Sequence, residues 1–188
     1  FINISIATQN IFAFILPVII TTVFISPNPI HFLQLDNKPS IKAVLLMLAI
    51  YFAMTPAMNC LVDWNANISL PESMKAIESW LRASEDAAAA VTDRILNSNN
   101  IFLSILLVGA LTGLSEEVLF RGGLQRILAT RPMNIHIAIW ISAFIFSAIH
   151  FLFFGFFPRL IIGAFLGYLA YWSGSLWIAV IAHAVNNS

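Results

Sequence analysis

The sequence contains a single cysteine, Cys60, so it cannot form an intramolecular disulfide, and one thiol does not indicate a redox compartment. Charged residues make up only 10% of the chain and the formal net charge is zero, which argues against a nucleic-acid-binding protein. Cys60 is most simply a packing residue. Hydrophobic residues dominate instead: they make up 60% of the 188 residues, and the mean hydropathy of +0.88 places the chain among membrane proteins.

The opening stretch, up to residue 35, contains no Asp, Glu, Lys or Arg. It has neither an arginine-bearing start nor a small-residue cleavage site, so we interpret it as a membrane span and not as a signal peptide. The chain starts at Phe1, already inside an apolar stretch, and stops at Ser188, just after a polar cluster. We therefore expect it to be a fragment of a longer membrane protein.

Uncharged runs predict where the chain crosses the bilayer, because a helix needs about 20 apolar residues to span the hydrocarbon. The first two spans are predicted at 4–25, with a kink at Pro17, and at 43–62. The others are predicted at 95–120, with an amphipathic extension to about 129, at 133–154, and as two short helices on either side of 173–175. No internal repeat is evident.

The predicted fold class is therefore all-α: a polytopic transmembrane helical bundle with about six spans and one amphipathic interfacial helix. We expect one membrane domain over 1–188. It would comprise two N-terminal spans in 1–62, an amphipathic extramembrane segment in 63–97, and the core helices that carry a polar site in 98–188. The sequence does not predict the oligomeric state.

The extramembrane segment contains a predicted amphipathic helix over 69–97. Ser69 and Glu72 have the spacing of a capping box, and Pro71 suits a first helical turn. Apolar or small residues then recur at helical spacing, at Met74, Ile77, Leu81, Ser84, Ala88, Val91 and Ile95. The pattern is typical of an interfacial helix or of a lid packed on the bundle, and a gate for substrate entry is an alternative.

The loops carry unequal charge. Two lysines lie between the first two spans and three arginines lie in 121–131, so two loops on one side of the membrane are basic. The segment 63–94, on the other side, carries six acidic and three basic residues. By the positive-inside rule, the 121–131 side is predicted to be cytoplasmic, in a bacterial cytoplasmic membrane.

Two adjacent carboxylates, Glu116 and Glu117, are the most informative residues of the chain. They follow an uncharged run, 95–115, and each costs about 2.5–3.5 kcal/mol at such a depth in a membrane. Glu117 and Arg121 are four residues apart, so they can share a helix face and neutralise each other, which favours a structural role for that pair. Glu116 is left without a local partner, and a carboxylate shielded from water is a candidate general base.

Helix geometry brings two histidines near the depth of Glu116. Glu116 lies 17 residues before Met133, which marks a turn, and His150 lies 17 residues after it, so both are about 25 Å from the turn in antiparallel helices. The two helices that follow return the chain to within about one helical turn of that level at His183. Asn187, four residues further on, shares a helix face with His183.

These residues also have structural interpretations. A lone histidine in an apolar helix is often a packing residue, and His183 with Asn187 can serve hydrogen bonding between helices. The convergence of one acid and two histidines at one depth favours a common polar site. His31 and His136 lie near span ends and are interpreted as incidental.

Three short motifs occur in order within these predicted helices. They are E-E-x-x-x-R at Glu116, Glu117 and Arg121, F-x-x-x-H at Phe146 and His150, and H-x-x-x-N at His183 and Asn187. With these motifs, residues 101–188 resemble the CAAX protease and bacteriocin-processing family (CPBP, also called Abi), whose members include intramembrane glutamate proteases. Residues 1–100 carry no motif of this kind.

The resemblance implies an intramembrane endopeptidase that hydrolyses a peptide bond of a membrane-associated or lipidated protein without a cofactor. It implies that Glu116 and His150 activate a water and that His183 and Asn187 stabilise the oxyanion. These roles agree with amide hydrolysis, which needs a base beside water and donors where charge develops. The partners expected are the substrate and the lipid bilayer, with no nucleic acid.

Three alternatives stay open from the sequence. Glu116, His150 and His183 are residue types that bind zinc in metalloproteases, although the chain has no HExxH motif. A non-catalytic bacteriocin-immunity or scaffold membrane protein of the same family is the second. A proton-coupled transporter is the third, but no inverted repeat supports it.

Overall fold

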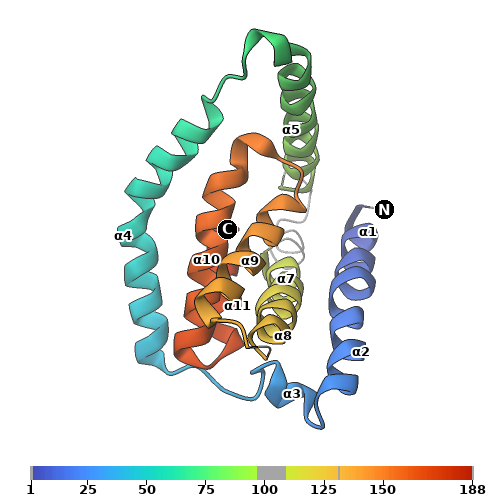
Figure 1. The fold of residues 1–188 in the computed structure, drawn as a ribbon, viewed down its shortest axis with the longest axis vertical. Helices are drawn as coiled ribbons and strands as arrows, with labels where there is room; N and C mark the ends of the chain where they lie inside the picture. Colours follow the sequence, from blue (N-terminus) through green and yellow to red (C-terminus); the bar gives the residue numbers. More distant parts are fainter. Residues whose placement is uncertain (1, 97–108, 131, 188) are drawn as a thin grey trace.

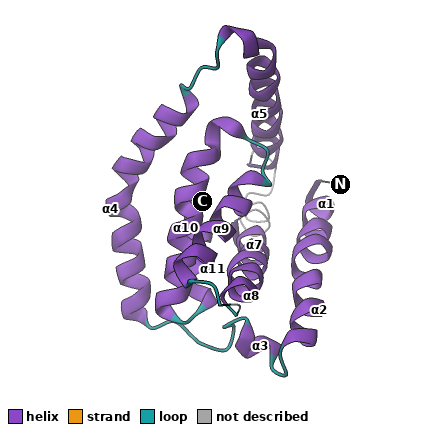
Figure 2. Ribbon diagram, viewed as in Figure 1, coloured by secondary structure: helices purple, strands orange, loops and turns teal. Residues whose placement is uncertain are grey.

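The computed structural model describes residues 2–96, 109–130 and 132–187, and every regular element within them is a helix (Figures 1 and 2). The predicted all-α fold is therefore confirmed. Within these ranges, three helices are long and apolar enough to cross a bilayer, and two shorter apolar helices accompany them. The long ones are Ile4–Ile25, Ile41–Ala66 and Phe153–Ser173, and the short ones are Ile135–Ala148 and Leu176–Asn186. The protein is an integral membrane bundle.

The first span is continuous but changes its pitch. α1 (Ile2–Gln9) passes into a π-helical segment, η1 (Asn10–Ile15), and then into α2 (Leu16–Ile25). Pro17 lies in the first turn of α2. Its ring clashes with the carbonyl four residues earlier and it has no N–H to donate, so the distortion predicted at Pro17 takes the form of this wider turn.

A short helix, α3 (Pro29–Phe32), and the loop after it tie the N-terminal spans to the end of the chain. The indole N–H of Trp177 donates to the Leu35 carbonyl at 2.8 Å. The side-chain amide of Asn37 donates to the Gly174 carbonyl, also at 2.8 Å. The loop therefore braces the turn between the last two helices.

The second span, α4 (Ile41–Ala66), is longer than the predicted 43–62. Its 26 residues extend about 39 Å, which exceeds a hydrocarbon thickness of about 30 Å. Ser40 caps it by accepting a hydrogen bond from a first-turn N–H at 3.2 Å. Its buried residues, Met47 and Asn65, lie near opposite ends, so α4 stands at the edge of the bundle and is held mainly at its two ends (Figure 1).

The remainder of α4 presents apolar side chains outward, as a lipid-facing helix does. Cys60 belongs to this exposed surface. The interpretation of Cys60 as a packing residue was therefore wrong, because α4 has no neighbour on that side among the described residues.

The amphipathic helix is confirmed, but the predicted capping box is not formed. A 3-10 turn, η2 (Glu72–Met74), precedes α5 (Lys75–Leu96), and no side chain caps it. Instead, the backbone N–H of Leu70 donates to the Glu78 carboxylate at 3.0 Å. This N–H and then the Arg82 guanidinium hold the pKa of Glu78 below its usual value, because both stabilise the charged form.

Polar side chains attach α5 to the rest of the protein. The Arg82 guanidinium carbon lies 3.9 Å from the centroid of the Phe154 ring, and Glu85 accepts a hydrogen bond from the Phe154 N–H at 2.7 Å. Part of the predicted apolar face stays exposed, at Met74, Ile77 and Val91. An exposed apolar strip beside the charged side chains that contact the bundle is typical of a helix at the membrane surface.

The helix that carries the glutamates consists of α7 (Thr112–Glu117), a π-helical segment η4 (Val118–Gln125) and α8 (Arg126–Ala129). It ends at Ala129, as predicted. Most of its predicted beginning, residues 97–108, lies outside the described residues. The following helix, α9 (Ile135–Ala148), ends earlier than the predicted 154.

After α9 the chain turns back sharply. Phe151 adopts a positive φ of 54°, and a 3-10 turn, η5 (Phe153–Gly155), leads into α10 (Phe156–Ser173). The division predicted at 173–175 is confirmed, because Gly174 has a φ of 64° and ends α10. The last helix is α11 (Leu176–Asn186).

Replacing Gly163 by Ala should destabilise the bundle, because α9 and α10 meet at this position. The new methyl would lie 3.2 Å from both the Ala143 Cβ and the Phe146 Cδ1, which is tighter than ordinary packing. Helix propensity alone would favour alanine by about 1 kcal/mol. The matched control is Gly113→Ala, whose methyl would meet its nearest atoms at 3.6 Å.

Thermal unfolding in one detergent should give a lower midpoint for Gly163→Ala than for the wild type, with no decrease for Gly113→Ala. Equal midpoints for the two variants would contradict the close contact of α9 with α10.

Candidate active site

Glu117 and Arg121 form a fully buried ion pair, as their spacing predicts. Arg121 donates from Nη1 to Glu117 Oε1 at 2.7 Å, and both side chains have an exposed fraction of 0%. Arg121 also donates from Nη2 to the Gly163 carbonyl at 2.8 Å, which connects this helix to α10. Its guanidinium carbon lies 4.6 Å from the centroid of the Phe146 ring. The pair therefore holds together the helices that surround the site.

His183 lies between the two glutamates. Its Nδ1 is 2.7 Å from Glu117 Oε1, and its Nε2 is 3.4 Å from Glu116 Oε2. A carboxylate oxygen accepts hydrogen bonds, so Nδ1 donates to Glu117 and Nε2 faces Glu116.

The expectation that Glu116 has no partner is correct only for its own helix. Glu116 is buried, with 8% of its surface exposed, and its neighbour is His183, which comes from α11. The i, i+4 rule compares residues within one helix. It therefore could not find a contact across 67 residues of sequence.

His150 lies beyond the end of α9 and not within a helix, so its predicted helical setting was wrong. Its Nδ1 is 2.7 Å from the carbonyl oxygen of Phe146. A carbonyl can only accept, so Nδ1 carries the proton and Nε2 carries the lone pair. This tautomer gives the pocket a neutral imidazole nitrogen that can accept a proton.

Phe146 separates the two histidines. Its ring centroid lies 5.1 Å from that of His150 and 5.9 Å from that of His183, in edge-to-face contacts with both. Phe146 itself is 3% exposed. The aromatic residue of the second motif therefore sets the relative positions of the two imidazoles.

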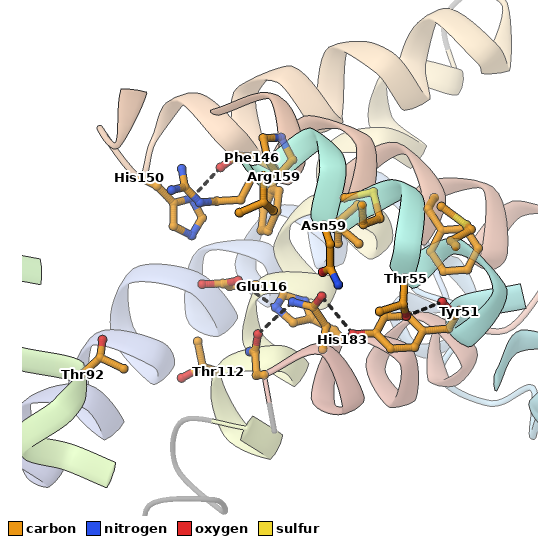
Figure 3. A pocket seen from close by; sticks show the side chains of 18 residues that line it. Tyr51, Thr55, Asn59, Thr92, Thr112, Glu116, Phe146, His150, Arg159 and His183 are labelled. Atoms are coloured by element: carbon orange, nitrogen blue, oxygen red, sulfur yellow. Dashed lines mark hydrogen bonds and ion pairs between the residues drawn. The ribbon is translucent and has the colours of Figure 1, made fainter. Parts of the chain in front are cut away.

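Glu116, His150 and His183 line one pocket of about 580 Å³ (Figure 3). The structure thus brings the predicted residues together, while their catalytic roles stay predictions. The walls come from α4, α5, α7, α9, α10 and α11. The remaining lining residues are Tyr51, Met54, Thr55, Met58, Asn59, Val62, Thr92, Thr112, Phe146, Pro158, Arg159, Ile162, Phe165, Asn186 and Asn187.

Sequence reasoning missed the contribution of α4. Tyr51, Thr55 and Asn59 recur every four residues, so they lie on one face of α4, and this face lines the pocket (Figure 3). Polar residues at this spacing in an apolar helix could have predicted that α4 faces a polar site. Arg159, in the first turns of α10, was also missed.

Asn187 lies at the C-terminal cap of α11, where its N–H donates to the His183 carbonyl at 3.0 Å. Both Asn187 and Asn186 line the pocket. Asn186 also accepts a hydrogen bond from the Tyr51 hydroxyl at 3.4 Å. Asn186 thus faces the site together with Asn187, because the regular helix α11 ends at Asn186.

The N-terminal span positions the helix that carries the glutamates. Asn10 is 3% exposed, and its side-chain amide donates to the Thr112 hydroxyl at 3.1 Å. The Ser115 hydroxyl in turn donates to the side-chain amide oxygen (Oδ1) of Asn10. These bonds hold Ser115, directly before Glu116, against η1.

The other two histidines lie away from the pocket, as expected. His31 pairs with Asp36 at 2.8 Å, and His136 lies 3.0 Å from the Tyr168 hydroxyl. In the ranges that the structure describes, no group of three or more His, Cys, Asp or Glu side chains is arranged to hold a metal ion. The metal-free mechanism is a separate matter and stays a prediction.

Residues 98–188 match a family model described as Type II CAAX prenyl endopeptidase Rce1-like. This match confirms the predicted resemblance. It covers all three motifs, so this part of the chain is similar to that endopeptidase family, and the long apolar helices suit a membrane protein. No curated protein and no solved structure matches the chain.

Glu117→Gln should destabilise the protein far more than Glu116→Gln. Removing Glu117's charge leaves Arg121 buried without a counter-charge, which costs about 3–5 kcal/mol. Glu116 makes only the longer contact with His183, at 3.4 Å. Unfolding midpoints of the two variants in the same detergent test this difference. Similar midpoints would show that the Glu117–Arg121 pair does not hold the helices.

Proposed function

We propose that the protein is an intramembrane endopeptidase in which Glu116 and His150 activate a water. The observation that carries this proposal is their meeting in one pocket with His183. Glu116 supplies a shielded carboxylate, and the Nδ1 bond to Phe146 leaves the His150 Nε2 as an acceptor. A carboxylate and a neutral imidazole at one cavity are the groups that general-base hydrolysis needs.

In the proposed reaction, Glu116 takes a proton from water, and the oxygen bonds to the carbonyl carbon of the substrate. The carbonyl π electrons move to its oxygen, which becomes an oxyanion. Collapse of this intermediate breaks the C–N bond, and the proton held by Glu116 passes to the leaving amine. His150 helps Glu116 to position this water.

His183 and Asn187 are proposed to stabilise the oxyanion. The hydrogen bond from Nδ1 of His183 to Glu117 holds the ring so that Nε2 faces the pocket wall, where an N–H on Nε2 would donate to the oxyanion. The Asn187 side-chain amide offers N–H donors at the same wall. Donors fixed before charge develops, in a site with little water, are the largest contributors to such catalysis.

The proposed substrate is a membrane-embedded or lipidated protein or peptide. The pocket lies behind α4, which is packed mainly near its ends, and Met54 and Met58 contribute to its wall. Methionine side chains adapt to irregular apolar partners. Mostly apolar walls around a few polar groups suit a chain that reaches the site from the lipid.

Glu116→Gln should lower the turnover of a fluorogenic prenylated CAAX peptide by at least about 10²-fold, because it removes the base and keeps the shape. The folded fraction in detergent should be unchanged. Asp86→Asn, on the exposed side of α5, is the control and should keep wild-type turnover. A Glu116→Gln protein with near wild-type turnover would refute the assignment.

Activity should survive exhaustive chelation, because the proposed base is a carboxylate and the water is not bound to a cation. Elemental analysis of active protein should find no stoichiometric zinc. Loss of turnover with a strong chelator, restored by Zn²⁺, would replace this mechanism by that of a metalloprotease.

We also propose that the 121–131 side faces the cytoplasm of a bacterium, since that side is the basic one. Asp86→Cys and Thr130→Cys, each in a Cys60→Ser background, place one exposed thiol at either end of the bundle. A membrane-impermeant thiol reagent should label the first in intact cells and the second only after permeabilisation. Labelling of both from outside would overturn the topology.

A further inference from the structure

Arg159 is a cation within an apolar span and has few hydrogen-bonding partners there. It lies in Phe153–Ser173 and is half-buried. Among the described residues, its one hydrogen bond runs from Nη1 to the Leu152 carbonyl at 3.1 Å. Charged residues in membrane helices ordinarily pair with an opposite charge or face a functional cavity. Within the described ranges, Arg159 forms no ion pair.

Glu85 of α5 contacts the turn that precedes α10, but its carboxylate is engaged by the backbone there. Glu85 accepts the Phe154 N–H at 2.7 Å and makes no ion pair with Arg159 in the part of the chain that the structure describes. Most of the hydrogen-bonding capacity of the guanidinium therefore stays available.

The position of the guanidinium is set by the turn beneath it. A Cβ on Gly155 would overlap Nη2 of Arg159, so the glycine leaves the space that the side chain occupies. Asn65 of α4 holds this turn by donating to the Phe153 carbonyl at 3.3 Å and accepting the Phe157 N–H at 2.9 Å. Because the turn is anchored, the Arg159 guanidinium is held in one orientation.

In that orientation, the guanidinium faces the candidate active site. Arg159 lines the same pocket as Glu116 and His150, and Figure 3 shows its side chain extending toward His150. Among the lining residues that the structure describes, Arg159 is the one Lys or Arg, and Glu116 is the one Asp or Glu. An anionic group that enters the pocket would therefore meet its counter-charge at Arg159 and be repelled from Glu116.

We propose that Arg159 determines substrate specificity by binding the free C-terminal carboxylate of the peptide whose scissile bond lies at Glu116 and His150. This inference rests on the proposed function. A guanidinium binds a carboxylate through two parallel hydrogen bonds, so the chemistry fits. A pocket of about 580 Å³ has the size of a small-ligand site, which favours the end of a chain over a segment that passes through.

Two prenylated CAAX peptides that differ only in a C-terminal carboxylate or carboxamide test the assignment. The wild type should bind and cleave the acid about 10- to 100-fold better, as expected for loss of a charge-assisted hydrogen bond. Arg159→Gln should remove this preference, mainly through a higher KM for the acid, and leave the amide unaffected. Arg126→Gln, at the opposite end of the bundle, should keep the preference.

Gly155→Ala gives a second test that retains the charge. Its methyl should displace the guanidinium, so the preference for the acid should fall while the amide is bound as before. Equal losses for acid and amide in both variants would make Arg159 a structural residue. A carboxamide peptide with an internal Glu that binds as well as the acid, dependent on Arg159, would refute recognition of the chain terminus.

Binding measured separately from cleavage distinguishes the two proposals. If neither peptide is cut but the acid still binds better through Arg159, hydrolysis fails and the carboxylate site stands. If both peptides are cut and bound equally, the protease stands and the Arg159 assignment is wrong. If added anionic lipid removes the preference for the acid, a lipid phosphate occupies the site, and the peptide assignment is wrong.

Discussion

The site depends on one carboxylate oxygen. Oε1 of Glu117 accepts from Arg121 and from His183, both at 2.7 Å, and Arg121 continues to the Gly163 carbonyl. These bonds join α7 and η4 to α10 and α11. All three side chains are buried, so each bond satisfies a charge or donor that would otherwise cost several kcal/mol to bury. The orientation of His183 toward Glu116 follows from this arrangement.

The second half of the site depends on the reversal of the chain after α9. His150 is held by the Phe146 carbonyl, and Arg159 by the space over Gly155. The turn between them is anchored from outside the matched family segment, by Asn65 of α4 and Glu85 of α5. The N-terminal half carries no motif, but its helices α4 and α5 hold the turn next to a residue that the motifs identify, His150.

The N-terminal spans also shape what the site can admit. Asn10 contacts the helix next to Glu116, and the polar face of α4 closes the opposite side of the pocket. Since α4 is anchored mainly near Met47 and Asn65, the wall between these points packs less tightly against the bundle. A pocket built in this way combines a tightly packed group of polar residues with a wall that faces lipid on its other side.

The sequence by itself determined the all-α membrane fold, the end of α8, the turn at Gly174 and the Glu117–Arg121 pair. All of these depend on local properties: uncharged run length, glycine's left-handed conformation and the i, i+4 spacing. Helix arithmetic also placed Glu116, His150 and His183 near one depth. Only the tertiary structure decided that Glu116 faces His183, that α4 and Arg159 line the pocket, and that His150 lies in a turn. These facts depend on how separate helices rotate and pack against one another, which residue spacing within a helix does not specify.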